Sequence, residues 1–293
     1  MNGNILAFDI GGSSIKYALV SSEGEVFESN DYKTSNEDIK IFKIDMLKII
    51  NKFKNLEGIA ISSPGAVDST SKIIGGVSAV PCIHENEWVL ELQKQTGLNI
   101  SIENDANCSL LAEVWLGNAK KKDNVISVVI GTGIGGCIQI NGEIYKGNDL
   151  MAGEFGLQLI NTENGLISTS RYLSTNALVN RVNKIVNVSN GMEVFKLYDD
   201  ENQKVVEEVN KYFKELCVFI YNLQYTFNPD VILIGGAISN RSDLISKIKE
   251  NYKMLDEEFE GTISNLNIDT CHFKNDANLI GAVYNFKKVV LHE

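Results

Sequence analysis

Two glycine-rich segments stand where a strand-like run ends, a position at which backbone N–H groups can bind an anion. Segments 9–14 and 131–136 read Asp-Ile-Gly-Gly-Ser-Ser and Gly-Thr-Gly-Ile-Gly-Gly. Glycine has no Cβ to block an approaching phosphate, and successive N–H groups in such a turn form an anion nest. One such turn is more often an ordinary hairpin. Two of them, with a Gly-Gly pair at 235–236, favour a cleft that holds nucleotide phosphates between facing turns.

Two common phosphate-binding patterns are excluded. Segment 131–136 fits G-x-G-x-x-G, but a dinucleotide fold needs a helix next and an acidic residue about 20 positions later. Here residues 137–140 read Cys-Ile-Gln-Ile, which is typical of a strand. The chain also lacks the pattern G-x-x-x-x-G-K-[ST] of a Walker-type loop. Any phosphate site in this chain therefore belongs to a different class.

A polar cluster at 103–107, Glu-Asn-Asp-Ala-Asn, lies between a strand pattern and a helical pattern. Helix N-caps are often Asn or Asp, so for Asn104 and Asn107 capping is as well supported as a functional role. For Asp105, a catalytic role in phosphoryl transfer is the specific alternative to capping. Its loose transition state needs positioned groups, Mg²⁺ to neutralise charge, and a carboxylate that receives the hydroxyl proton. We therefore expect Asp105 to act as a general base.

Hydropathy patterns predict the elements that position these residues. The predicted strands cover 5–8, 15–20, 25–33, 58–61, 100–103, 125–130, 137–140, 143–145 and 231–234, and the predicted helices cover 37–53, 88–95, 106–116, 171–185, 202–227 and 278–290. Strands and helices alternate, which indicates the α/β class. Because the succession of strand, glycine turn and strand occurs twice, we expect two lobes. Their predicted bounds are 1–117 together with a C-terminal helix at 278–293, and 118–277.

Composition narrows the function classes. The 293 residues are 44% hydrophobic and 22% charged, with a net charge of -11, which opposes binding to nucleic acid. The compact basic run at 120–122 fits a solvated turn. Five cysteines are scattered without a C-x-x-C pair, and we find no export signal or membrane-spanning run. We therefore expect a cytoplasmic protein without a membrane or nucleic-acid partner.

Five motifs together resemble the ROK family of bacterial sugar kinases, in order and spacing, over essentially the whole chain. They are Asp-Ile-Gly-Gly at 9–12, Ser-Pro-Gly-Ala-Val-Asp at 63–68, the two segments 103–107 and 131–136, and Ala-Gly-Glu-Phe-Gly at 152–156. The resemblance implies a two-lobed actin-like, ribonuclease H-like fold with a central nucleotide and sugar cleft. It also implies ATP-dependent phosphate transfer to the 6-hydroxyl of N-acetylmannosamine, glucose or a β-glucoside.

The resemblance also implies individual roles. Asp105 resembles the catalytic base, and Asp9 resembles the residue that organises Mg²⁺ through water. The residues that resemble phosphate contacts are Gly11, Gly12, Ser13, Thr132 and Gly133, those that resemble adenosine contacts are Gly235 and Gly236, and those that resemble sugar contacts are Gly65, Asn104, Asp105 and Glu154.

The chain departs from the typical family pattern at two sugar ligands. Leu157 stands where the family has His, and Ser170 stands where it has a second glutamate. No cysteine occurs between 137 and 217, so we expect no zinc site. This resembles a zinc-free branch with β-glucoside kinases and some N-acetylmannosamine kinases. With fewer protein ligands for sugar hydroxyls, the site rejects a sugar with a blocked hydroxyl less strongly, so we expect a substituted hexose as substrate. Segment 75–86, which contains His84, is a candidate to replace the missing part of the sugar pocket.

Two other function classes stay open. The family includes sugar-responsive repressors, which carry a helix-turn-helix domain ahead of the first strand, whereas here the strand pattern begins at Ile5. A sugar-binding protein without catalysis predicts decay of the base or of the glycine turns, and both are present. An Asp105 variant that binds but does not transfer phosphate would favour the enzyme. The resemblance also implies a homodimer.

Overall fold

The chain forms two compact units. The computed structural model describes residues 4–263 and 265–292. Unit 1 comprises Met1–Lys121, Lys146–Met151 and His272–Glu293, and unit 2 comprises Lys122–Tyr145 and Ala152–Cys271. The short segment Lys146–Met151 therefore belongs to unit 1 although both of its neighbours in sequence belong to unit 2.

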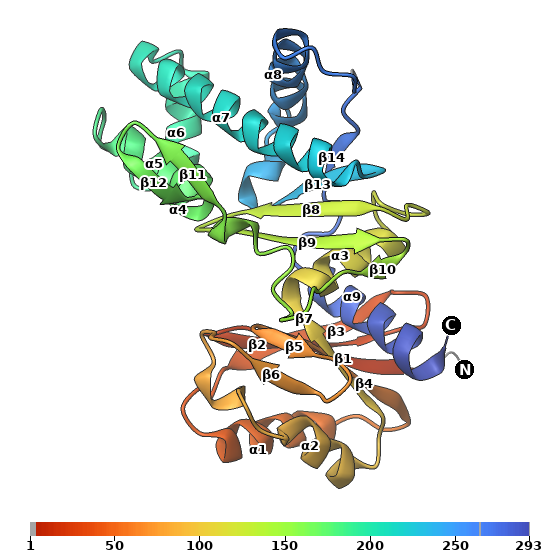
Figure 1. The fold of residues 1–293 in the computed structure, drawn as a ribbon. Coiled ribbons are helices and arrows are strands. Elements are labelled where there is room, and N and C mark those ends of the chain that lie inside the picture. Colours follow the sequence, from red (N-terminus) through yellow and green to blue (C-terminus); the bar gives the residue numbers. More distant parts are fainter. Residues whose placement is uncertain (1–3, 264, 293) are drawn as a thin grey trace. The chain divides into compact units, whose positions relative to one another are not determined.

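Unit 1 is built on a five-stranded mixed sheet (Figure 1). Its strands, in spatial order, are β3 (Val26–Lys33), β2 (Ser14–Val20), β1 (Asn4–Ile10), β4 (Leu56–Ser63) and β7 (Ile100–Asn104). The first three strands form an antiparallel meander, while β1, β4 and β7 run parallel. The carboxyl ends of these three parallel strands therefore lie side by side at one edge of the sheet.

Helices cover both faces of this sheet (Figure 1). They are α1 (Ile39–Ile50) and α2 (Trp88–Thr96) on one face, and α3 (Asp105–Trp115) and α9 (Ala277–Phe286) on the other. Side chains alternate between the faces of a strand. In β1, Leu6 and Phe8 pack with α1 and α2, while Ile5 and Ala7 pack with α9. Asp9 follows Ile5 and Ala7 in this alternation, so its side chain also faces the side of α3 and α9.

Helices α3 and α9 approach each other closely because of a glycine. A Cβ atom added at Gly281 of α9 would lie 1.7 Å from the backbone oxygen of Cys108 in α3, a distance that no real contact has. The two helices begin next to the sheet edge, with Asp105 at the first position of α3 and Asn278 in the first turn of α9. Gly281 thus fixes the spacing between the helices that carry these two polar side chains.

Unit 2 contains a second five-stranded sheet of the same type. Its strands, in spatial order, are β10 (Glu143–Ile144), β9 (Ile134–Ile140), β8 (Val125–Ile130), β13 (Val231–Gly235) and β14 (Ile268–Thr270). Strands β8, β13 and β14 run parallel, and β8 to β10 form an antiparallel meander. The predicted repetition of strand, glycine turn and strand is therefore present in both units.

Further elements complete each unit. The helices of unit 2 are α4 (Thr169–Leu173), α5 (Thr175–Asn183), α6 (Gly191–Asp199), α7 (Gln203–Phe227) and α8 (Leu244–Glu258). Two small hairpins pair β5 (Ala66–Asp68) with β6 (Ile73–Gly75), and β11 (Leu159–Thr162) with β12 (Gly165–Ser168). The single-turn helices are η1 (Pro81–Ile83), η2 (Phe155–Leu157) and η3 (Ala237–Asn240), and a π-helical turn, η4 (Lys287–Leu291), follows α9.

The predicted α/β class is confirmed, whereas one predicted helix is wrong and several observed elements were not predicted. The helix predicted over 171–185 is two helices, because Ser174 has extended backbone and its hydroxyl accepts a hydrogen bond from Ala177 N at 3.1 Å. Helices α6 and α8 were not predicted, nor were β5, β6, β11, β12 and β14. Among residues 4–263 and 265–292, no helix combines the length and apolarity needed to cross a bilayer.

Candidate active site

Three polar residues form a row across the parallel strands of unit 1. In the strand register, Asp9 of β1 pairs with Ser62 of β4, and Ser62 pairs with Glu103 of β7. Residues in register on neighbouring strands point to the same face of a sheet. Ligands of open α/β sheets bind beyond the carboxyl ends of the strands, and this row lies at those ends. The row therefore forms the floor of the candidate site.

Asp9 is held by hydrogen bonds to one of its two carboxylate oxygens. Its Oδ1 accepts from Ser62 Oγ at 2.8 Å and from Asn278 Nδ2 at 3.0 Å. Burial raises the pKa of Asp9 above its usual value, and these two hydrogen bonds and the charge of Lys16 only partly offset the effect. A buried carboxylate of this kind is costly to keep ionised, which indicates a use for its charge.

The environment of Asp9 fits a hydrated magnesium ion. In the described residues both hydrogen bonds go to Oδ1, so Oδ2 is left to accept from a ligand or water. Mg²⁺ usually keeps several waters and takes only one or two protein carboxylates. Within the same residues, no cluster of three or more His, Cys, Asp or Glu side chains is arranged to hold a metal ion. The residues therefore fit a loosely held, water-bridged ion better than a closed metal cage.

Asn104 caps the helix that carries the predicted base. Its Oδ1 accepts hydrogen bonds from Ala106 N at 2.9 Å and Asn107 N at 3.2 Å, and its Nδ2 donates to Gly65 O at 3.0 Å. Of the two roles that the sequence left open for Asn104, the structure therefore shows the cap. A sugar contact by Asn104 or Gly65 stays a prediction.

Asp105 occupies the first position of α3 and is half-buried. Its Oδ1 accepts a hydrogen bond from its neighbour Ala106 N at 2.8 Å. The N-terminus of a helix carries partial positive charge, which favours a carboxylate there. Burial is the main reason that the pKa of the Cys108 thiol lies well above its usual value, and the carboxylates of Glu103, Asp9 and Asp105 add to it. All three acidic groups therefore act electrostatically on one buried thiol.

The turn of Gly11, Gly12 and Ser13 is tightly closed beside this row. Gly11 N donates to Ser14 O at 3.0 Å, and Thr34 at the end of β3 holds the turn through Gly11 O and Ser13 O. Gly12 lies against the segment after β6, because a Cβ added there would be 2.6 Å from Ala79 Cβ. The exposed Ser13 lies at the tip of the turn. Both glycines are thus required by packing within the protein, and their predicted contact with phosphate stays a prediction.

Replacing Gly12 by Ala should destabilise this turn, because the new methyl group overlaps that of Ala79. We expect a loss of about 1–3 kcal/mol of folding stability, measured by thermal unfolding, together with a raised KM for ATP. A second change, Ala79→Gly, removes the clashing methyl group and should restore both quantities in the double variant. Equal stability of Gly12→Ala and the wild type would contradict this account.

In unit 2, residues 131–133 form the turn between β8 and β9, and residues 134–136 of the predicted glycine turn already belong to β9. Gly131 N donates to Gly133 O at 2.9 Å, and Thr132 at the tip is exposed. Ser170 of α4 holds the far side, since its Oγ accepts from Ile134 N at 2.9 Å. Ser170, which we expect in place of the family's second glutamate, therefore supports the glycine turn.

Two more predicted segments lie close to this turn within unit 2. A Cβ at Gly236 would be 2.1 Å from Ile130 O at the end of β8, and the φ of Gly236 is +86°. A Cβ at Gly153 would be 3.0 Å from Gly136 O, so the bend before the exposed Glu154 packs on β9. Gly235 and Gly236 therefore lie at the end of β13 beside the end of β8, and Glu154 follows a bend that packs on the neighbouring strand β9.

The predicted residues form one group in each unit. The unit 1 group contains Asp9, Gly11, Gly12, Ser13, Gly65, Asn104 and Asp105, and the unit 2 group contains Thr132, Gly133, Glu154, Gly235 and Gly236. That both groups bind one nucleotide and one sugar stays a prediction.

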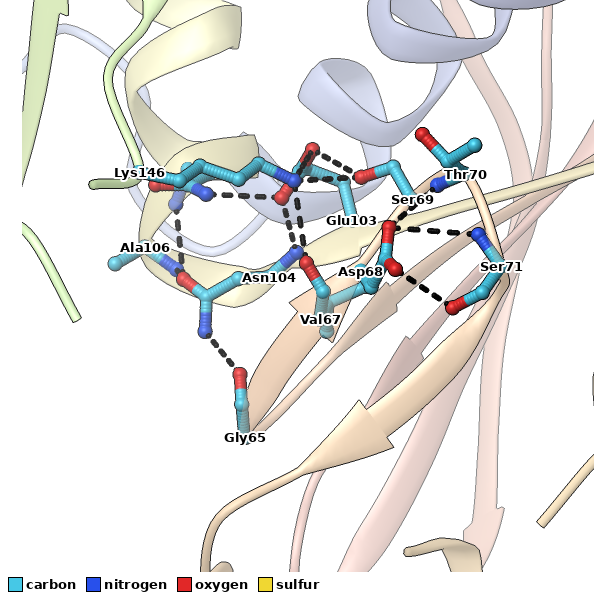
Figure 2. A network of polar contacts seen from close by, with 11 residues as sticks. Gly65, Val67, Asp68, Ser69, Thr70, Ser71, Glu103, Asn104, Ala106 and Lys146 are labelled. Carbon is cyan, nitrogen blue, oxygen red and sulfur yellow. Dashed lines mark hydrogen bonds and ion pairs between the residues drawn. The ribbon is translucent and has the colours of Figure 1, made fainter. Parts of the chain in front are cut away.

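Sequence reasoning missed the polar groups that support these residues. Ser62 and Asn278 hold Asp9, and Lys146 forms an ion pair with Glu103 at 2.7 Å (Figure 2). A glutamate at the end of a buried strand signals that a cation is needed, because a buried charge is seldom left unpaired. The sequence could have shown that Glu103 needs a cation, but not that Lys146, which is distant along the chain, supplies it.

Each unit has a five-stranded sheet in which an antiparallel meander adjoins parallel strands, the arrangement of the actin-like, ribonuclease H-like sugar-kinase fold. The profile of the ROK family matches residues 5–289. A β-glucoside kinase from Listeria monocytogenes is 34% identical over 294 residues, covering 96% of this chain and 97% of that kinase. A β-glucoside kinase from Klebsiella pneumoniae is 31% identical over 296 residues, covering 97% and 96%. The crystal structure of a ROK family protein from Streptococcus pneumoniae in complex with sucrose matches with a TM-score of 0.90 at 31% identity, covering 99% of this chain and 100% of that one. The chain belongs to the ROK family, which confirms the predicted resemblance and fold.

Proposed function

We propose that this chain, an ATP-dependent sugar kinase, transfers the γ-phosphate of ATP to the 6-hydroxyl of a hexose or hexose derivative, with Asp105 as the general base. The observation that carries the proposal is the presence of two carboxylates at the carboxyl ends of β1 and β7, the two strands that flank β4. Asp9 lies in the strand register beside Ser62, and Asp105 lies at the N-terminus of α3, directly after β7. One carboxylate is suited to a hydrated cation and the other to a substrate hydroxyl.

In the proposed reaction, Asp105 accepts the proton of the sugar 6-hydroxyl as that oxygen bonds to the γ-phosphorus. The bond between this phosphorus and the β,γ-bridging oxygen breaks, and ADP leaves with the bridging oxygen. Because the transition state is loose, the proton moves late and the protein acts mainly by positioning. Backbone N–H groups at Gly12 and Gly133 would hold phosphate oxygens, whereas Gly11 N is bonded to Ser14 O and would shape the turn.

Asp9 would hold Mg²⁺ through water. When bound, the ion neutralises charge that develops on the phosphate oxygens. The other contributions come from this chain's own residues. Ser62 and Asn278 orient the Asp9 carboxylate, and the cap at Asn104 orients the first turn of α3. Exclusion of water by the bound sugar would keep the phosphate from hydrolysis.

The surroundings of His84 support a place for segment 75–86 in the sugar pocket. Its Nε2 lies 2.7 Å from Ser78 Oγ, and its ring packs against Gly65, whose carbonyl binds the Asn104 side chain. His84 Nδ1 is buried and has no hydrogen-bond partner in the described part of the chain. A buried polar atom of this kind usually binds a ligand or a water. Segment 75–86 therefore adjoins the cap of α3 and supports the proposal that it contributes to the sugar pocket.

A coupled ADP-release assay tests the proposal. Glucose, N-acetylmannosamine, N-acetylglucosamine and a β-glucoside are compared at equal concentration with ATP and Mg²⁺, and the product is analysed for phosphate at the 6-position. We expect sugar-dependent ADP release with at least one of them. Release without sugar, or a product phosphorylated at another hydroxyl, would overturn the proposal. Sugar binding by calorimetry without any ADP release would instead favour a non-catalytic sugar-binding protein.

A further inference from the structure

We propose that Lys146 is a positioning residue: its ion pair with Glu103 fixes the first turn of α3 and so the Asp105 carboxylate. The inference rests on the proposed function, in which Asp105 is the base. Lys146 itself belongs to none of the five sequence motifs, and it stands at the start of Lys146–Met151, the short segment that returns to unit 1.

The ammonium group of Lys146 is bound by three oxygens (Figure 2). Its Nζ lies 2.7 Å from Glu103 Oε2, 2.6 Å from Ser69 Oγ and 3.2 Å from Val67 O. A lysine ammonium has three donors, so this arrangement uses all of them. The side chain of Lys146 is 20% exposed and that of Glu103 is 4% exposed. The pair is therefore largely removed from water, unlike an ordinary surface ion pair.

Glu103 connects this cation to the helix. Its Oε2 faces Lys146 and Ser69, while its Oε1 accepts from Asn104 N at 2.8 Å and from Asn107 Nδ2 at 2.8 Å. Both residues bonded to Oε1 flank Asp105. The same carboxylate therefore holds the residue before Asp105 and the residue two positions after it.

The remaining contacts extend the restraint. Asn104 caps α3 through Ala106 N and Asn107 N, and it bonds Gly65 O. A buried carboxylate that loses its cation is strongly unfavourable, and the surrounding structure rearranges to relieve it. Asp105 follows Glu103 by two positions, and Asp9 lies in the same row of the sheet across Ser62, so removal of Lys146 leaves these like charges without their cation. The first turn of α3 is the part of the chain that would shift.

Removing the charge with Lys146→Met tests the inference. We expect kcat to fall by about 10- to 100-fold, because a displacement of about 1 Å in a reacting group costs this much, while the KM for ATP stays within about twofold. Hydrogen exchange of the peptide covering 103–108 should accelerate at least about threefold. A purely structural role would change thermal stability alone and leave the exchange of this turn and kcat unaltered.

Lys43 provides the matched control. It forms an ion pair with Glu91 between α1 and α2, on the opposite face of the sheet, and its side chain is 18% exposed, close to the value for Lys146. Lys43→Met should leave kcat and the exchange of 103–108 unchanged. If Lys146→Met does not fold, Glu103→Gln serves instead, since it removes the same ion pair and keeps the shape of the side chain.

The outcomes separate the inference from the proposed function. Unchanged exchange at 103–108 in Lys146→Met, or in Glu103→Gln if the first variant does not fold, overturns the positioning role whether or not the protein is active. If the wild type is active, an unchanged kcat in the variant also overturns the positioning role. If the wild type releases no ADP with any hexose, the proposed function fails. Accelerated hydrogen exchange at 103–108 would then still support the statement that the Lys146–Glu103 ion pair fixes the first turn of α3.

Discussion

Asp105→Asn should lower kcat by about 10²- to 10⁴-fold, the range that removal of a general base typically costs. Asparagine keeps the size of the side chain and an oxygen that can accept the hydrogen bond from Ala106 N. It cannot accept the hydroxyl proton. We therefore expect the Kd values for ATP and sugar, measured by calorimetry, to stay within about threefold of the wild type while turnover is lost.

The control for this variant is another aspartate at a helix N-terminus of unit 1. Asp38 caps α1, where its side chain accepts a hydrogen bond from Lys40 N, and it lies on the opposite face of the sheet from Asp105. Asn is also a favoured cap, so Asp38→Asn should keep full activity and near-native stability. Turnover by Asp105→Asn within about tenfold of the wild type would show that another group takes the proton.

Asp9→Asn should lose activity by at least about 10²-fold, because the charge stabilisation supplied through Mg²⁺ amounts to several kcal/mol. The same variant should be more stable than the wild type at pH 7. Burial raises the pKa of Asp9 despite the opposing hydrogen bonds from Ser62 and Asn278, so holding this charge costs folding free energy at neutral pH. The uncharged asparagine avoids that cost.

The direction of the pKa shift of Asp9 determines how the stability of the protein depends on pH. Between the ordinary pKa of 3.8 and the raised value in the folded protein, the native state binds more protons at Asp9 than the unfolded state does. Stability from this group therefore falls as pH rises through the folded pKa. The gain in Tm of Asp9→Asn should be largest at pH 7 and should shrink as pH approaches 3.8. Thermal unfolding in EDTA measures it, and about 2–4 °C corresponds to each kcal/mol in domains of 150–250 residues.

Asp68 provides a contrast of opposite sign. Hydrogen bonds from the Ser71 hydroxyl and from Thr70 N lower the pKa of Asp68, and Figure 2 shows both contacts. The native state therefore binds fewer protons at Asp68 than the unfolded state, and its contribution is present at neutral pH and lost in acid. Asp68→Asn should consequently lower the Tm at pH 7. A lowered Tm at pH 7 for Asp9→Asn as well would contradict the account of Asp9.

The fold class and the position of the candidate base were predictable from local patterns. Alternating strand and helix periodicity predicted the α/β class, and the segment at 103–107 predicted a helix that starts beside Asp105. The glycine turns were also predictable, since Gly11 and Gly12 have no space for a Cβ. These features depend on residues close together in the chain, so their signals remain visible in the sequence.

Other elements were missed although the sequence carries a signal for them. Helices α6 and α8 were not predicted, yet the buried residues of α8, Leu244, Ile248, Tyr252 and Leu255, recur at helical spacing. The break at Ser174 is a local cap, since the Ser174 hydroxyl accepts a hydrogen bond from Ala177 N. The apolar positions on both sides of it pack on one core, so hydropathy periodicity alone does not reveal the break.

What the sequence by itself determined is which residue types stand where each strand ends: an aspartate near the end of β1 with glycines after it, and Glu-Asn at the end of β7 with Asp105 after it. Only the tertiary structure decided what surrounds them. It placed Ser62 and Asn278 on Asp9, and Lys146 on Glu103, from segments far apart along the chain. The reason is physical: strand register and helix packing bring distant segments together, and a buried charge is stabilised by whichever partner that packing supplies.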